Sequence, residues 1–399
     1  MKQKRSQLLF YTVLLLALLF VWRPASAAEP EISASAPQDA IVKGQLERLD
    51  TKEVEAFWQK VLDKYGGYLP ESEGKSLFEM MTGEKAFSFS GVMKGLGSFL
   101  FHEMIINGKL LGAILIITVF AMVLETLQTA FEKNTVSTVA YAISYLVLII
   151  LAINSFRVAI DFAQGAIHDM VGFMLALMPL ILALLASTGG VTSAALFHPM
   201  IVFLVNISGT LISTIVFPLL FLSAILSIVS SFSVKYQLTR LAHLLRTVSL
   251  GLMGSFLTIF LAVLSLQGAA AAVADGVAIR TAKYIAGNFV PVVGRVFADA
   301  ADTVVGASLL VKNAVGMAGV LILLLLVAFP ALKILILAFL YNLSSAVMQP
   351  LGNSPILSCL SIIGKNLLYI FGALATVSLM FFLAITIVIS AANVSVMMR

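Results

Sequence analysis

The sequence has few charged residues, and acidic residues are especially rare beyond position 108. Charged residues make up 11% of the 399 residues, against about 25% in soluble domains. Of the 20 acidic residues, only seven lie in residues 109–399. A stretch of this length with so few ionised side chains cannot cover itself as a water-soluble domain. We therefore predict that it lies in a lipid bilayer.

Cysteine and the usual catalytic motifs are also scarce. Cys359 is the single cysteine, so disulfides cannot hold an exported part of the chain together. The sequence contains no G-x-x-x-x-G-K-[ST], no H-E-x-x-H and no paired cysteines, which are the motifs for phosphate and zinc chemistry. The four histidines fall in four different segments. These absences predict a protein that is not an enzyme and that has no cofactor and no metal site.

The first 27 residues are typical of a signal peptide. A basic start at residues 2–5 precedes an apolar run at residues 8–21, which is short for a membrane span. Ala25 and Ala27 fit the small-residue pattern of a cleavage site. An uncleaved anchor is the alternative, and in both cases the segment that follows is exported.

Residues 28–108 form an acidic region with 13 acidic and eight basic residues, which argues against a nucleic-acid partner. Residues 50–65 carry apolar side chains at helical spacing, Phe57 and Trp58 among them. So short a helix cannot enclose a core alone. Its apolar face packs either on the rest of this region or on a partner protein, which makes Phe57 and Trp58 candidate partner contacts. Residues 87–107 predict an interfacial amphipathic helix.

Residues 109–399 predict an all-α polytopic membrane domain with about eight transmembrane helices. Pro218 and Pro330 leave the number open, because each proline either separates two spans or kinks one. The expected apolar segments are 110–130, 136–156, 170–187, 196–217, 218–232, 248–272, 314–329, 331–348 and 367–390.

Basic loop residues predict the orientation. Lys235, Arg240 and Arg246 stand in one short connection without an acidic residue, so this connection should face the cytoplasm. Counting spans back places the acidic region outside, in agreement with a signal peptide. Counting forward, with a turn at Pro330, places Arg399 inside.

The stretch 276–312 is neither a clean span nor a polar loop, because Pro291 divides two half-length apolar runs. This pattern is typical of a re-entrant or interfacial hairpin that is buried in protein or lines water. A solvated loop is the alternative. The candidate interface or pore residues are Pro291, Gly294, Arg295, Asp299, Asp302 and Lys312.

Charged residues inside the predicted spans are few. Lys333 follows Pro330, and Arg157 stands four residues before Asp161 on one helical face. We interpret them as snorkelling side chains or local ion pairs. The spans lack the chain of ionisable residues expected of a proton-driven transporter. This favours a structural platform, and a stand-alone transporter of a small solute remains the alternative.

Three stretches of the sequence resemble the stage III sporulation protein AE family of endospore-forming bacteria: Ala286–Gly294, Phe297–Gly306 and Ser308–Asn313. The resemblance implies a multi-pass protein of the mother-cell membrane around the forespore. It also implies a trans-envelope, secretion-like channel complex that supports late forespore gene expression. The implied partners are ring-forming and ATPase proteins of the same operon and a forespore membrane protein. The resemblance supplies no catalytic residue.

The predicted cleavage site can be tested directly. Cleavage after Ala27 should give a membrane-inserted protein that starts at Ala28, because signal peptidase cuts behind the small-residue pattern. N-terminal sequencing of the protein from membranes measures this. A chain that still starts at Met1 would contradict the prediction.

Overall fold

The computed structural model describes residues 42, 44–46, 49–69, 89–130, 135–232, 238–289, 293–352 and 354–397. The chain divides into residues 1–39 and residues 40–399. The first unit, with Ala25 and Ala27, lies outside the described residues, so the predicted signal peptide stays a prediction. All that follows concerns the second unit.

All described secondary structure is helical, which confirms the all-α prediction. A π-helical segment, 212–216, joins α8 and α9, and short 3-10 turns lie at 66–68 and 349–351. The α-helices are α3 (Lys52–Tyr65), α5 (Phe89–Ile106), α6 (Gly108–Ala130), α7 (Thr135–Ser187), α8 (Val191–Leu211), α9 (Phe217–Phe232), α10 (Thr239–Phe289), α11 (Val293–Met348) and α12 (Pro355–Met397).

Six stretches of the described helices are long and apolar enough to cross a membrane, where the sequence predicted about eight. They are 108–127, 139–187, 191–231, 239–281, 303–348 and 355–391. The difference arises because pairs of predicted spans join into single long helices. The 53 residues of α7 extend about 80 Å at 1.5 Å per residue. A bilayer core is about 30 Å thick, so such helices continue well beyond one bilayer core.

Neither proline that left the span number open ends a helix. Pro330 lies inside α11, and Pro218 follows the π-helical segment that joins α8 to α9. A wider π turn accommodates a residue that lacks a backbone N–H and whose ring crowds the preceding turn. Membrane helices tolerate such prolines because neighbouring groups satisfy the freed carbonyl. Of the two alternatives for Pro330, the turn between two spans is therefore wrong, and Pro330 lies within one long helix.

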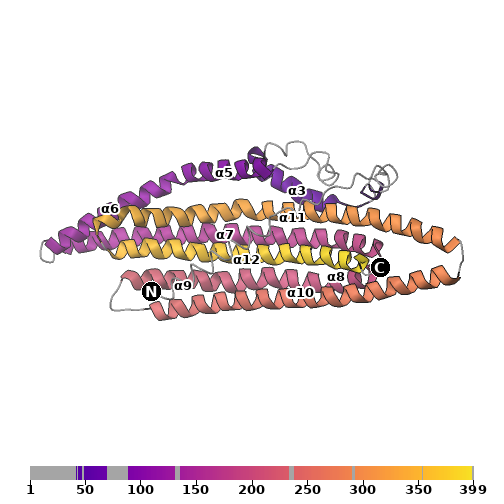
Figure 1. Cartoon of the computed structure of the whole chain (residues 1–399). Coiled ribbons are helices and arrows are strands. Elements are labelled where there is room, and N and C mark those ends of the chain that lie inside the picture. The colour runs from indigo at the N-terminus through magenta and orange to yellow at the C-terminus, as the bar shows by residue number, and fades with distance from the viewer. Residues whose placement is uncertain are drawn as a thin grey trace. The chain divides into compact units, whose positions relative to one another are not determined.

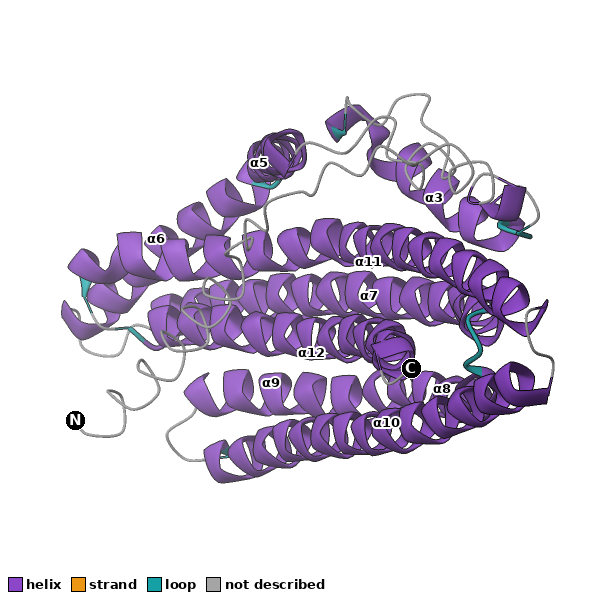
Figure 2. Ribbon diagram, turned by 45° about the vertical axis from the view of Figure 1, so that its right-hand side comes forward, coloured by secondary structure: helices purple, strands orange, loops and turns teal. Residues whose placement is uncertain are grey.

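Helices α7, α11 and α12 form the centre of the described bundle (Figures 1 and 2). Helix α3 packs on α7 and α11, and α5 packs on α11. Helices α6 and α8 pack chiefly on α7, α9 packs beside α12, and α10 lies on the outer side of α8, α9 and α12. The two glycines Gly316 and Gly319 bring α11 close to both central neighbours. A side chain at Gly316 would collide with Ile389 of α12, and one at Gly319 would collide with Leu177 of α7.

Hydrogen bonds fix which helix ends lie together. At one end, Arg246 near the start of α10 donates to Asn366 near the start of α12. At the other end, Lys312 of α11 donates to Asn393 near the end of α12. Helix α12 therefore finishes at the end of the bundle opposite Arg246.

This arrangement changes the expected side of the C-terminus. If Arg246 faces the cytoplasm as predicted, α12 finishes outside, whereas the sequence placed Arg399 inside. The reversal follows from Pro330, because a turn there would have added one crossing. Arg399 itself lies outside the described residues.

Buried Asp275 joins the two outer helices at the far end from Arg246. Its two carboxylate oxygens accept hydrogen bonds from the backbone N–H groups of Thr192 and Ser193, both at 3.0 Å. These N–H groups belong to the first turn of α8, which has no intrahelical acceptors for them. Asp275 of α10 thus caps α8, a role that the sequence analysis did not predict.

Two exposed positions on α10 test the orientation. Arg240 near its start and Tyr284 near its end are both exposed, and about 66 Å of continuous helix separates them. In a Cys359→Ser background, Tyr284→Cys should react with a membrane-impermeant thiol reagent in whole cells, whereas Arg240→Cys should react only after the membrane is opened. Labelling of Arg240→Cys in whole cells would show that the start of α10 faces outside and would contradict the predicted orientation.

Candidate functional site

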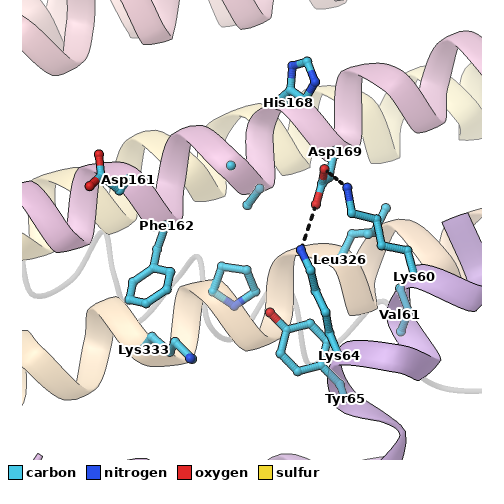
Figure 3. A pocket seen from close by; sticks show the side chains of 13 residues that line it. Lys60, Val61, Lys64, Tyr65, Asp161, Phe162, His168, Asp169, Leu326 and Lys333 are labelled. Carbon is cyan, nitrogen blue, oxygen red and sulfur yellow. Dashed lines mark hydrogen bonds and ion pairs between the residues drawn. The ribbon is translucent and has the colours of Figure 1, made fainter.

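The candidate site is a cluster of charged side chains where α3 packs against α7 and α11. Asp169 of α7 is its central acid. Its Oδ1 lies 2.5 Å from Lys60 Nζ, and its Oδ2 lies 3.6 Å from Lys64 Nζ. The two lysines are one helical turn apart from each other on α3, so the single carboxylate of Asp169 pairs with both (Figure 3).

Lys333 of α11 occupies the other side of the cluster. Its ammonium group lies 2.9 Å from the Glu103 carboxylate of α5. The ammonium group also lies 4.8 Å from the ring centre of Phe162 and 5.8 Å from that of Phe99, which is within the range of cation–π attraction. Lys333 therefore forms a local ion pair, as the sequence analysis interpreted it.

A cavity of about 420 Å³ lies between these groups. The hydroxyl of Tyr65 points toward it, while the His168 ring points away on the far side of α7 (Figure 3). Burial, together with the nearby charges of Asp169 and Glu103, raises the pKa of Tyr65 to about 12, so its phenol stays protonated. The lining residues are Lys60, Val61, Lys64, Tyr65, Asp161, Phe162, Gly165, Ala166, His168, Asp169, Leu326, Pro330 and Lys333.

Aromatic packing holds α3 in place beside the cavity. The Tyr65 ring stacks on Phe329 of α11 with 4.0 Å between ring centres. Trp58 has no exposed surface, and Phe57 meets Phe173 of α7 edge-to-face at 5.7 Å. The cluster is thus built on a rigid contact between the acidic region and the membrane helices.

These contacts differ from the role predicted for Phe57 and Trp58. The sequence offered two neighbours for their apolar face, the rest of residues 28–108 or a partner protein. The structure places the face on α7 and α11 of the same chain. The predicted partner contact is corrected for Trp58, because a fully buried side chain has no surface left for another protein.

A polar stripe runs along the exposed face of α7 beside the cavity. Asn154, Arg157, Asp161, Gly165 and His168 are all exposed and follow one another at spacings of three or four residues, which places them on one face. Arg157 Nε lies 4.0 Å from Asp161 Oδ2, so the predicted pair is present. Charged side chains seldom face lipid hydrocarbon, which makes this stripe a candidate surface for contact with water, headgroups or another protein.

The predicted interface or pore segment forms the adjoining ends of two long helices. Helix α10 ends at Phe289 and α11 begins at Val293, so described residues on both sides of Pro291 are helical. Pro291 lies outside the described residues. Gly294, Arg295, Asp299 and Asp302 lie in the first turns of α11, but their side chains also lie outside the described part of the chain, and their roles stay predictions.

Lys312 is fully buried, which the sequence did not foresee. Its Nζ donates to Asn393 Oδ1 at 2.8 Å and to the Ile389 carbonyl at 3.1 Å, both in α12. Four residues earlier, buried Ser308 exchanges hydrogen bonds with Gln45. Lys312 thus joins α11 to α12, and it does not line any of the described cavities.

The three residues of the predicted cytoplasmic basic loop have different environments. Lys235 lies outside the described residues, and Arg240 is exposed. Arg246 is part-buried, where it donates to Ser227 and Asn366 and lies 4.9 Å from the ring centre of Tyr369. Arg246 therefore fastens α10 to α9 and α12 in addition to contributing charge.

Comparison with known proteins identifies the family. The family described as stage III sporulation protein AE matches residues 72–392. The chain belongs to this family. A relative of that name from Bacillus subtilis (strain 168) is 52% identical over 396 residues, which cover 98% of this chain and 99% of the relative. No solved structure matches.

Family membership implies a role in sporulation. The family match begins at residue 72, after α3 and its two cavity lysines. The alignment with the Bacillus subtilis relative covers nearly the whole chain. Among the described residues no group of three or more histidine, cysteine or acidic side chains is placed to hold a metal ion.

Trp58 should hold α3 on the bundle. Trp58→Ala removes a fully buried ring, which costs about 3–5 kcal/mol in protein cores. A single short helix docked by one face should then detach while the long helices stay packed. Hydrogen exchange of residues 52–65 in the purified protein should rise sharply, and exchange of α7 and α11 should not. Glu53→Ala, at an exposed position of the same helix, is the control, and unchanged exchange in Trp58→Ala would contradict this role.

Proposed function

We propose that the chain is a membrane subunit of a trans-envelope, secretion-like channel complex that links mother cell and forespore. The proposed location is the mother-cell membrane around the forespore, with the acidic region outside the cytoplasm. The proposed partners are ring-forming and ATPase proteins of the same operon and a forespore membrane protein. The complex would sustain late gene expression in the forespore, and this subunit would carry out no reaction.

Membership of a sporulation family supports the setting. The polar stripe on α7 is the observation that carries the role of a subunit. An exposed Arg157–Asp161 pair, with exposed Asn154 and His168 on the same face, lies within an apolar helix, and charged side chains inside a span usually pair within protein or line water. A neighbouring protein surface, or the water of a shared channel, would accept the pair.

The described part of the bundle offers little for solute transport coupled to an ion gradient. Its ion pairs join structural elements: Lys333 with Glu103, and Lys60 and Lys64 with Asp169. Each of these pairs fixes a short helix onto a long one. This favours a platform over the alternative of a stand-alone transporter.

Removal of the charged pair in the polar stripe tests the proposal. The double variant Arg157→Leu with Asp161→Leu removes both charges together, so neither is left uncompensated. It should insert normally, because both side chains are exposed. It should lose co-purification with its operon partners from sporulating cells and should lower the yield of heat-resistant spores severalfold, with arrest after engulfment.

A matched control uses the same face of α7. Ile150→Leu alters an exposed apolar position one turn before the stripe and should behave like wild type. Normal spore yield and normal co-purification in the double-leucine variant would contradict the proposed interface. Ion-driven movement of a defined solute by the purified protein alone in liposomes would contradict the subunit role itself.

A further inference from the structure

The cavity between α3, α7 and α11 carries more positive than negative charge. Lys60, Lys64 and Lys333 line it together with Asp161 and Asp169. The partner of Lys333 is Glu103, and that of Asp161 is Arg157. With these two outer residues included, four cations meet three carboxylates, so the described residues of the cluster carry one more positive than negative charge.

The lysines also keep unused hydrogen-bond donors. An ammonium group has three N–H donors. Lys60 donates one of them to Asp169, Lys333 pairs with Glu103 at 2.9 Å, and Lys64 makes only a longer ion pair with Asp169. Lys64 is held most weakly, at 3.6 Å from Asp169, and its side chain is 52% exposed. The protonated hydroxyl of Tyr65 adds another donor at the cavity (Figure 3). The cavity therefore presents donors and a net positive charge to a single volume.

The cavity lies where the exposed face of α7 changes from apolar to polar. Ile143, Leu146 and Ile150 are exposed on the apolar part, and Asn154, Arg157 and Asp161 follow on the same face. Basic and amphipathic side chains concentrate where hydrocarbon gives way to headgroups. The α7 side of the cavity starts at Asp161, about one helical turn beyond Arg157, so the cavity adjoins this change from apolar to polar side chains.

We infer that this cavity binds an anionic phosphate group, held by Lys60, Lys64 and Lys333 with Tyr65 as a further donor. The phosphate belongs either to the headgroup of an acidic phospholipid or to a soluble phosphate. In both cases the ammonium groups supply charge-assisted hydrogen bonds. The bound group balances the excess charge and ties α3 to α7 and α11. This site does not depend on the proposed channel role.

Binding measurements on the full chain test the inference. The protein is placed in nanodiscs of phosphatidylcholine, with or without an equal part of phosphatidylglycerol, and retained lipid is counted by native mass spectrometry. Phosphatidylglycerol should be retained in preference to phosphatidylcholine. Lys64→Gln should weaken that retention about tenfold, which is the effect of losing one hydrogen bond to a charged group. Asp169 keeps Lys60 as its partner in this variant.

Two further variants keep the result interpretable. Lys52→Gln removes an exposed lysine from the same helix outside the cavity, and it should bind like wild type. Lys64→Arg keeps the charge and should retain most of the binding. Circular dichroism shows whether each variant keeps its helix content.

Inorganic phosphate distinguishes the two sources. If millimolar phosphate leaves retained phosphatidylglycerol in place, the site takes a lipid headgroup. If phosphate displaces the lipid and also raises the unfolding temperature in neutral detergent, the site takes soluble phosphate as well. Equal retention of both lipids, or equal retention of phosphatidylglycerol by wild type and Lys64→Gln, together with no effect of phosphate, would overturn the inference.

Discussion

Helix α11 packs closely on its two central neighbours at two glycines, where an added side chain would press on a neighbouring side chain. At Gly316 the neighbour is Ile389 of α12, and at Gly319 it is Leu177 of α7. Lipid chains are as apolar as the helix surfaces, so within a bilayer the hydrophobic effect does not drive helices together. Their association depends on close packing and on hydrogen bonds. The two glycines supply that packing on both sides of α11. The remaining described helices then pack on α7, α11 or α12.

This central packing also explains where polar groups lie. Helices of 53 and 56 residues extend far beyond the hydrocarbon of one bilayer, so some of their length must meet water, headgroups or protein. In the second half of each helix, Asp169 of α7 reaches outward to α3 and Lys333 of α11 reaches outward to α5. The short helices thereby neutralise charges that a bare membrane helix would leave unpaired. The acidic region and the membrane helices are therefore joined through these ion pairs.

The sequence predicted the membrane class, the helical fold and the apolar face of α3, because each depends on composition or on local periodicity. It predicted too many spans, because Pro218 and Pro330 read as breaks. Whether a proline interrupts a helix depends on the groups packed around it, and a π turn before Pro218 has no sequence pattern of its own. The sequence analysis also divided α7 into two spans, because the polar residues around Asp161 resemble a loop.

The candidate site was harder to predict, because its residues lie far apart in the chain. Lys60, Asp169 and Lys333 each look like an isolated charge, and only the packing of α3 across α7 and α11 brings them together. Trp58 could be assigned to an apolar face but not to a neighbour. A periodic pattern states that a face will be buried and leaves its partner open.

The stretch Ser308–Asn313, which carried part of the family resemblance, shows how a sequence motif can serve packing. Ser308 and Lys312 are four residues apart and both are fully buried, so one face of α11 carries both. Ser308 bonds to Gln45 ahead of α3, and Lys312 bonds to α12. A buried ammonium group without its acceptors costs several kcal/mol. This part of α11 therefore contacts both α12 and the start of the acidic region through buried polar groups, which links the N-terminal region to the last helix.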